Sequence, residues 1–421
     1  MKVTVKWVAA VAATAVFLGA GLASPAWSAE DKAAKPADTK DRKVSKAAAK
    51  PLKAAKDAAD AKKWPEALEK LKEVEAIADR SPWDTHVMNE LYGFVYVRTQ
   101  QYPEAAKALE AGLEDGFTEE ADVPNRVRAL AQVNYQIKNY DKAIQYGNRA
   151  VKDGYADDDM YTLIGQAYYI KQDYKGTIKF IDEYVANQMK AGKPPKEQSL
   201  QLVLSSCVNL EDNVCSTKAL EQLVAYHPKP NYWQNLLYSM FQQEGQTDKS
   251  LLHVYRLASE VDVLKRPEDY TEFAQLAIEA GSPGEAQAIL EKGMAKNVFT
   301  EPKLVDRNKR LLETAKKQAA ADLAGLDKIA KDAASGKTGD KDVSVGLAYL
   351  SYKQYDKAIE AINRGLAKPG VQNEGEAHLL LGIAEFGAGH KDEAQKAFGA
   401  VKGDAKLERI ANLWSLHARQ A

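Results

Sequence analysis

The stretch LYGFVYVRTQQYPEAAKALEAGL, residues 91–113, holds the pattern that decides the fold. Two helix-favouring segments flank the polar break TQQ, and Tyr102 begins the second of them. Gly93 and Ala105 stand twelve residues apart, one on each side of the break. In an antiparallel helical hairpin, a small residue on each helix lets the backbones pack closely, while the aromatic ring fills the gap at the turn. The stretch therefore predicts a tightly packed helical hairpin.

The same spacing recurs along the chain, which indicates a repeat architecture. Small residues twelve apart are found at Gly93 and Ala105, Ala131 and Ala143, Gly165 and Thr177, Gly346 and Ala358, Ala55 and Ala67, Ala274 and Ala286, and Gly382 and Ala394. The turn aromatics Trp64, Tyr102, Tyr140 and Tyr174 follow one another at intervals of 38, 38 and 34 residues. Tyr355 occupies the same place in the segment QYDKAIEAINRGL, which begins at Gln354.

From about Pro51 to the C-terminus, the chain resembles a tetratricopeptide-repeat (TPR) protein. The resemblance is clearest in residues 91–113 and in LIGQAYYIKQDYKGTIKFI, residues 163–181. It implies an all-α fold, a right-handed superhelix of helical hairpins whose first helices line a concave surface. Weaker repeats are predicted at residues 198–228, 230–258 and 268–294. The resemblance specifies the fold and leaves the function open.

These patterns predict five segments. They are a signal peptide (1–28), a flexible Ala/Lys-rich leader (29–49), a first solenoid block (50–297), a degenerate charged helix pair with a loop (298–340), and a second block (341–421). The second block ends in DAKLERIANLWSLHARQ, whose apolar residues recur at helical spacing. We expect this last helix to cap the open end of the stack.

The first residues predict export. Lys2 and Lys6 lead into the apolar run WVAAVAATAVFLGAGLA, and the small residues Ala26 and Ser28 follow. This is the pattern of a secretory signal peptide cleaved after Ser28, with an uncleaved anchor as the alternative. No later apolar run approaches the ~20 residues of a membrane helix, so we expect a periplasmic protein that is not inserted in the membrane after cleavage.

Composition argues against two classes of partner. The chain has 58 basic and 59 acidic residues, so it lacks the basic excess expected of a protein that binds nucleic acid or an anionic membrane.

The sequence contains no catalytic motif: its six histidines are scattered, and no nucleophile elbow, P-loop or dinucleotide motif is present. The acidic run Asp157–Asp159 could bind calcium or, as an alternative, start the following helix. We expect no enzyme activity, no cofactor and no metal site.

The concave surface is the predicted binding site. With the small residue of each first helix as register, the groove positions include Asn125, Arg128, Gln132, Tyr135, Gln166, Tyr169 and Tyr238. Amides can pair with a peptide main chain, and aromatic rings add contact area at a low entropy cost. These residue types favour an extended peptide as the ligand. The alternative interpretation is an ordinary solvated helix face.

A second, looser resemblance concerns function. AGKPPKEQSLQLVLSSCVNLED (191–212) and LVAYHPKPNYWQNL (223–236) are similar to exported repeat proteins of Gram-negative bacteria, some of them encoded beside TonB, ExbB and ExbD components. The resemblance implies a non-enzymatic scaffold or adaptor that binds protein partners of an envelope complex. The alternative is an assembly or chaperone-like factor for outer-membrane or polysaccharide export, and a hydrolase is the third class. The sequence does not indicate an oligomeric state.

The only two cysteines, Cys207 and Cys215, flank the turn NLEDN. Residues on either side of such a turn face each other across the hairpin. A metal site would need further ligands, and a redox motif more often has the spacing CxxC. In an oxidising compartment we expect a structural disulfide, with two buried free thiols as the alternative.

Overall fold

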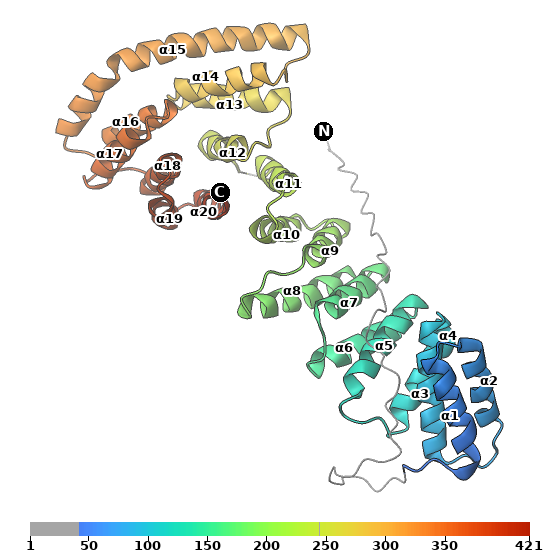
Figure 1. The fold of residues 1–421 in the computed structure, drawn as a ribbon. Helices are drawn as coiled ribbons and strands as arrows, with labels where there is room; N and C mark the ends of the chain where they lie inside the picture. The colour runs from blue at the N-terminus through green and yellow to red at the C-terminus, as the bar shows by residue number, and fades with distance from the viewer. Residues whose placement is uncertain (1–41, 244) are drawn as a thin grey trace. The chain divides into compact units, whose positions relative to one another are not determined.

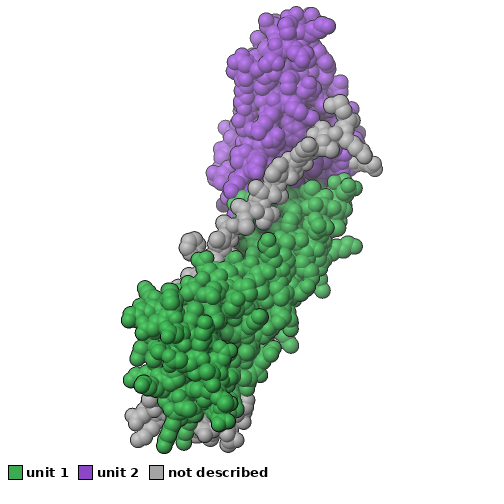
Figure 2. Space-filling view, turned by 90° about the vertical axis from the view of Figure 1, so that its right-hand side faces the viewer, with its two compact units in different colours: residues 1–219 green, residues 220–421 purple. Residues whose placement is uncertain are grey.

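The computed structural model describes residues 42–243 and 245–421, and every regular element in them is an α-helix (Figure 1). Contacts divide the chain into unit 1, residues 1–219, and unit 2, residues 220–421, coloured separately in Figure 2. The predicted all-α helical-hairpin fold is confirmed. The predicted signal peptide and residues 29–41 of the predicted leader lie outside the described residues.

Unit 1 is a stack of helical hairpins, each made of a first and a second helix. The pairs are α1 (Lys46–Asp60) with α2 (Trp64–Glu75), α3 (Pro82–Arg98) with α4 (Tyr102–Glu114), α5 (Val123–Gln136) with α6 (Tyr140–Lys152), α7 (Asp158–Ile170) with α8 (Tyr174–Lys190), and α9 (Glu197–Asn209) with α10 (Asn213–Tyr226). The boundary between the two units falls inside α10.

Unit 2 continues the hairpin pattern but contains one long helix. Its hairpins are α11 (Pro230–Phe241) with α12 (Asp248–Glu260), α13 (Pro267–Glu279) with α14 (Pro283–Ala295), α16 (Asp340–Ser351) with α17 (Tyr355–Leu366), and α18 (Glu374–Gly387) with α19 (Lys391–Gly399). The helix α15 (Pro302–Ser335) lies between the second and third of these hairpins, and α20 (Ala405–Gln420) ends the chain.

The hairpin turns share one backbone conformation. In eight of them the residue two positions before the second helix has a positive φ, and this residue is Lys62, Gln100, Lys138, Gln172, Glu211, Gly281, Lys353 or Gly389. A left-handed residue reverses the chain directly after the last turn of the first helix. The tyrosines predicted to begin second helices do so, because α4, α6, α8 and α17 start at Tyr102, Tyr140, Tyr174 and Tyr355.

The small residues predicted at the hairpin contacts are all buried. Where the first-helix residue is glycine, a large side chain sixteen positions later fills the space above it. A Cβ atom added to Gly93 would lie 2.6 Å from Leu109 Cδ2, and one added to Gly165 would lie 2.7 Å from Ile181 Cδ1. The close helix approach inferred from the spacing is therefore present.

The leader prediction is wrong at its C-terminal end. Residues 46–49 form the first turn of α1, and Ala48 is fully buried. Ser45 caps this helix by accepting a hydrogen bond from the backbone N–H of Ala48 at 3.2 Å. The backbone N–H of Ser45 in turn donates to Asp84 of α3 at 2.9 Å. The cap and the alanine-rich turn extend the helix beyond the boundary that composition suggested.

The predicted helix pair at residues 298–340 is also wrong. Residues 302–335 form the single helix α15, because the segment has no proline after Pro302 and only one glycine, Gly325, in its interior. The hairpins on either side meet directly, since the backbone N–H of Glu285 donates to Ser351 Oγ at 3.2 Å. The loop after α15 is therefore no boundary between two blocks, and both hairpins belong to unit 2.

The C-terminal helix α20 buries the apolar face that the sequence predicts, including Leu407, Ile410 and Trp414. It packs against α18 and α19 and also against α12, far earlier in the chain. The side-chain amide of Gln420 donates to the carbonyl oxygen of Val224 at 2.9 Å. Unit 2 thus curves back on itself, and α20 closes it onto its own first helices (Figure 1).

The two cysteines are joined in the structure by a disulfide between the end of α9 and the start of α10, with Cα atoms 5.5 Å apart. Cys207 is fully buried. Among the described residues, no helix combines the length and the apolar character that crossing a membrane requires.

Candidate functional site

The inner face of unit 1 is formed by first helices. The backbones of α5 and α7, and of α7 and α9, approach one another directly. The second helices α4 and α6 meet through long side chains, with Lys142 Nζ donating to Glu110 Oε1 at 2.6 Å. In a curved stack the concave side is the one where successive backbones come closest. The row of first helices is therefore the concave side of unit 1.

Three of the predicted groove residues lie together on this face. The hydroxyl of Tyr135 on α5 donates to Gln166 Oε1 on α7 at 3.1 Å. Tyr169, one turn further along α7, accepts a hydrogen bond from Asn209 Nδ2 on α9 at 3.2 Å. Nearer the N-terminal end of α7, the hydroxyl groups of Thr162 and Ser199 on α9 are 3.4 Å apart. Side-chain hydrogen bonds thus connect the three helices, and two of the bonded residues, Gln166 and Ser199, are buried.

The two tyrosines also support their own hairpins. Tyr135 packs edge to face on the turn tyrosine Tyr140 with ring centroids 5.6 Å apart, and Tyr169 packs on Tyr174 in the same way at 5.4 Å. Burial raises the pKa of the Tyr135 hydroxyl above its usual value. These rings are therefore part of the repeat packing as well as of the inner face.

The remaining predicted groove residues of unit 1 differ in their hydrogen bonding. Arg128 donates from Nε to the carbonyl oxygen of Tyr155 at 2.7 Å and pairs with Asp157 at 3.4 Å, so it holds the connection between α6 and α7. Asn125 is exposed and Gln132 is half-buried. Neither amide has a hydrogen-bond partner within the described part of the chain. These two side chains are available to a ligand.

A buried ion pair stabilises the same surface at its N-terminal end. Arg126 on α5 pairs with Glu90 on α3, with Nε donating to Oε1 at 2.9 Å, and both side chains are almost fully buried. Burial lowers the pKa of Arg126 to about 10, so the guanidinium remains charged near neutral pH. Breaking one partner of such a pair leaves an uncompensated buried charge, and the pair therefore ties α3 to α5.

Tyr238 does not belong to this face, because it lies on α11 in unit 2. Its hydroxyl donates to Asp269, and the guanidinium of Arg266 sits 4.7 Å from its ring centroid. Burial, followed by the bond to Asp269, raises the pKa of Tyr238 to about 12. Tyr238 links α11 to the start of α13.

The acidic run at residues 157–159 begins a helix. Asp157 is the N-cap of α7 and accepts from the backbone N–H of Met160 at 2.9 Å. Asp159 accepts from Lys196 Nζ at 2.5 Å. Of the two interpretations left open by the sequence, the structure supports the helix start. No group of three or more His, Cys, Asp or Glu side chains in the described residues is placed to hold a metal ion.

The interior of unit 2 contains a buried polar network that sequence reasoning missed. Arg256 on α12 donates from Nε and Nη2 to the two oxygens of Glu285 on α14, at 2.9 and 2.6 Å. Its Nη1 lies 3.2 Å from His253 Nδ1, and His253 Nε2 lies 3.4 Å from Glu376 Oε1 on α18. A neutral imidazole with the proton on Nε2 satisfies both contacts, accepting from Arg256 and donating to Glu376.

The electrostatics of this network follow from its burial. His253 is 1% exposed, and burial lowers its pKa below the ordinary value. The hydrogen bond from His253 holds the pKa of Glu376 down to about 2, so this carboxylate is ionised. Lys249 Nζ also donates to Glu376, at 3.2 Å. No sequence motif signals this network, because His253 and Glu376 are 123 residues apart.

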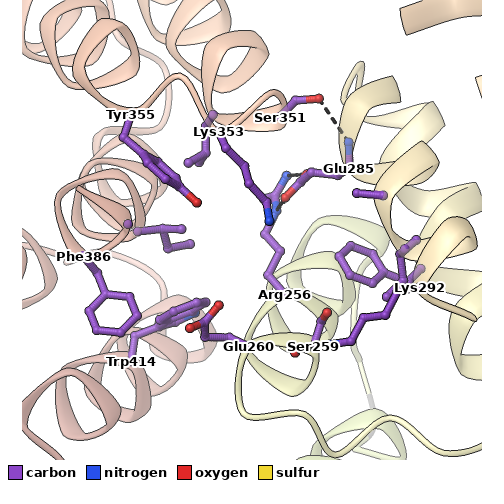
Figure 3. A pocket seen from close by; sticks show the side chains of 16 residues that line it. Arg256, Ser259, Glu260, Glu285, Lys292, Ser351, Lys353, Tyr355, Phe386 and Trp414 are labelled. Atoms are coloured by element: carbon purple, nitrogen blue, oxygen red, sulfur yellow. Dashed lines mark hydrogen bonds and ion pairs between the residues drawn. The ribbon is translucent and has the colours of Figure 1, made fainter. Parts of the chain in front are cut away.

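Arg256 lines two pockets inside unit 2. One has a volume of about 520 Å³ and is lined by residues of α12, α13, α14, α16, α17, α18 and α20 (Figure 3). The other, of about 550 Å³, is lined by the N-terminal halves of α12, α16 and α18 together with the end of α13. Pockets of this size can hold small molecules.

Comparison with known families identifies one segment of the chain. Residues 95–159, which span α4, α5, α6 and the connections between them, match the family model described as tetratricopeptide repeat. This segment carries tetratricopeptide repeats. TPR segments are typical of proteins that bind other proteins, so the coarse functional class is a protein-interaction scaffold. No curated protein matches this chain in sequence.

Solved structures with similar TPR-type folds are distant in sequence. A tetratricopeptide repeat protein from Parabacteroides merdae is 10% identical, with a TM-score of 0.31, and the match covers 71% of this chain and 98% of that one. The TPR2AB-domain:pHSP90 complex of yeast Sti1 is 14% identical, with a TM-score of 0.25, and the match covers 71% of this chain and 100% of that one. The pentatricopeptide repeat protein PPR10 from maize is 14% identical, with a TM-score of 0.30, and the match covers 88% of this chain and 52% of that one.

Proposed function

We propose that this protein is a periplasmic, non-enzymatic adaptor of the bacterial envelope that binds a protein partner on the inner face of unit 1. One observation carries the proposal. The first helices α5, α7 and α9 are joined by side-chain hydrogen bonds, and on α5 the amides of Asn125 and Gln132 have no partner within the described chain. An amide offers both a donor and an acceptor, which matches the main chain of an extended peptide.

The partner we propose is a protein of an envelope complex, and a TonB-type energy-transduction system is the specific candidate. This part rests on the resemblance of residues 191–212 and 223–236 to exported repeat proteins encoded beside such systems. Export is supported by the signal-peptide pattern of residues 1–28. Mass spectrometry of the protein from the periplasmic fraction tests it, with a mature N-terminus at Ala29 as the expected result and an intact Met1 as the contradicting one.

Crosslinking capture from whole envelopes tests the binding face. The test variant carries Asn125→Ala and Gln132→Ala, which remove two available amides without touching the hairpin packing. The matched control carries Gln145→Ala and Asn187→Ala, two exposed amides on the second helices α6 and α8. We avoid alanine at Tyr135 and Tyr169, because their rings pack on the turn tyrosines.

We expect the Asn125/Gln132 variant to capture about tenfold less partner than the control, since each lost hydrogen bond to a buried peptide group leaves that group unsatisfied. Equal capture by the two variants would refute the binding face. Recovery of TonB, ExbB or ExbD components supports the proposed complex. Recovery of nascent outer-membrane proteins instead would identify an assembly factor.

A further inference from the structure

The pocket of about 520 Å³ inside unit 2 has the character of a ligand site, independent of the face proposed in unit 1. Its walls come from seven helices, α12, α13, α14, α16, α17, α18 and α20, and from the turn before α17. Both charged and apolar side chains line it (Figure 3). The donors, acceptors and charges of its lining residues indicate the chemical class of the ligand.

The two carboxylates in the pocket, Glu285 and Glu260, each lie beside a donor of the protein. Both carboxylate oxygens of Glu285 receive hydrogen bonds from Arg256. The carboxylate of Glu260 lies 3.8 Å from His417 Nε2. The neighbouring His417, with smaller contributions from Lys292 and Lys353, lowers the pKa of Glu260. A ligand that has only hydrogen-bond donors would therefore find few unpaired acceptors in this pocket.

Three donors in the same pocket lack an acceptor within the described residues. The indole Nε1–H of Trp414 is buried without a partner, and the whole side chain is 2% exposed. Tyr355 has no hydrogen bond from its hydroxyl, which points into the open space in Figure 3. Lys353, in the turn before α17, has no carboxylate within ion-pair distance. A buried donor left unpaired is unfavourable, so the pocket is short of an acceptor.

Charge and shape narrow the ligand further. The lining carries three cations, Arg256, Lys292 and Lys353, and two anions, Glu260 and Glu285. Arg256 pairs with Glu285, and Lys292 pairs with Asp262 outside the lining, so among the described residues Lys353 is the cation of the pocket without a carboxylate within ion-pair distance. That balance fits a single negative charge. Apolar surface is supplied by Phe273, Ile289, Ile383 and Phe386. A ligand that meets both needs has one carboxylate and an apolar or aromatic body.

We propose that this pocket binds an organic monocarboxylate with an apolar or aromatic body, held by Lys353, the hydroxyl of Tyr355 and the indole of Trp414. Such a carboxylate has two sources, a free small acid or the C-terminus of a peptide that ends in an apolar residue. The pocket recognises the shared chemistry, and the experiment separates the sources.

Calorimetric titration of the purified full-length protein tests the site. The probes are 3-phenylpropionate and a pentapeptide with a free C-terminal phenylalanine. Each is compared with its neutral amide, 3-phenylpropionamide or the amidated peptide. The variants are Lys353→Gln and Tyr355→Phe. Lys353→Gln preserves the turn, because Gln100 and Gln172 have the same left-handed φ in equivalent turns, and Tyr355→Phe keeps the ring.

Lys138→Gln is the matched control, since Lys138 has the equivalent left-handed turn position in unit 1. We expect saturable binding of at least one acid, affinity about tenfold lower for its amide and for each pocket variant, and no change for Lys138→Gln. Binding of 3-phenylpropionate identifies a free acid as the source, and binding of the peptide alone identifies a chain terminus. Absence of saturable binding for both acids, equal affinity for the amides, or an equal loss in Lys138→Gln would overturn the proposal.

Discussion

Four buried glycines, Gly93, Gly165, Gly346 and Gly382, each lie beneath a large apolar side chain of the second helix of the same hairpin. The missing Cβ is what allows the second helix to come close. At Gly346 the fit is among the tightest, because an added Cβ would lie 2.3 Å from Ile362 Cγ1 and 3.2 Å from the carbonyl oxygen of Ala358. Close packing of the two helices at these positions therefore requires a residue without a Cβ atom.

The substitution Gly346→Ala should destabilise unit 2 by about 1–3 kcal/mol, because the methyl group forces α16 away from α17. Urea unfolding monitored by circular dichroism measures the change. Gly399→Ala, at the end of α19, is the control, since its Cβ would meet no atom within 4 Å. We expect the control to be neutral or slightly stabilising, and an equal loss in both variants would contradict the packing argument.

The buried imidazole of His253 makes stability depend on pH. Burial lowers its pKa in the folded protein, whereas the unfolded chain binds this proton near 6.5. The contribution of the neutral imidazole is therefore complete above pH 6.5 and is lost as the pH falls toward the folded pKa. The carboxylate of Glu376 adds a second window, because its pKa of about 2 lies below the ordinary 4.5. Its contribution is lost between those two values.

We expect the free energy of unfolding of the wild-type protein to fall more steeply than that of His253→Gln between about pH 7 and about pH 5. Protonation at Nδ1 would remove the acceptor for Arg256 and place two cations side by side. Urea titrations at a series of pH values give both slopes. Parallel slopes for the two proteins would mean that His253 is not the group responsible.

The helix α15 is the element that departs most from the repeat pattern. It is 34 residues long and is charged over most of its surface, with only six buried residues in its length. Leu323 and Ile329 are about half exposed. Its continuity comes from residues of high helix propensity and from the lack of an internal proline. The repeat period predicted a turn in this interval, but local propensity decides the outcome.

The substitution Gly325→Ala distinguishes one continuous helix from a helix pair. In a continuous helix it should stabilise the protein by up to about 1 kcal/mol, because alanine replaces glycine in a helix interior. The added Cβ would lie 3.7 Å from Ile329 Cδ1, which is an ordinary contact. A turn at this glycine would instead make the substitution unfavourable. Thermal unfolding gives the sign of the change, and a clear loss of stability would refute the single helix.

Taken as a whole, unit 2 is closed on itself. α20 packs on α12 as well as on its neighbours, and Arg409 of α20 donates from Nε to Glu221 at 2.8 Å. Trp233 and His417 meet edge to face with ring centroids 6.1 Å apart. A cap on an open stack would contact only the preceding hairpin, whereas this helix connects both ends of the unit.

Removing residues 404–421 should therefore loosen α11 and α12 together with α18 and α19. Hydrogen–deuterium exchange with mass spectrometry measures the protection of each helix. The amides of α1 to α8, residues 46–190, have no contact with α20 and serve as the internal control, which should keep its protection. Loss of protection confined to α18 and α19 would show that α20 acts as a simple cap.

The sequence by itself determined the hairpins of this protein. The spacing of small residues such as Gly346 and Ala358, and the tyrosine that begins each second helix, are local patterns, and they predicted where most helices begin and which faces are buried. They placed Tyr135, Gln166 and Tyr169 on one face, because equivalent positions in successive repeats must lie side by side.

Only the tertiary structure decided how the repeats end. The closure of unit 2 by α20 and the contact between His253 and Glu376 join residues more than a hundred positions apart. The pocket likewise brings Lys353, Tyr355 and Trp414 together with Arg256. Asn209 as the partner of Tyr169 was missed for a related reason, since hairpins in this interval depart from the regular spacing. Contacts between distant repeats depend on the accumulated curvature of the stack, a sum of small rotations between hairpins that no local spacing records.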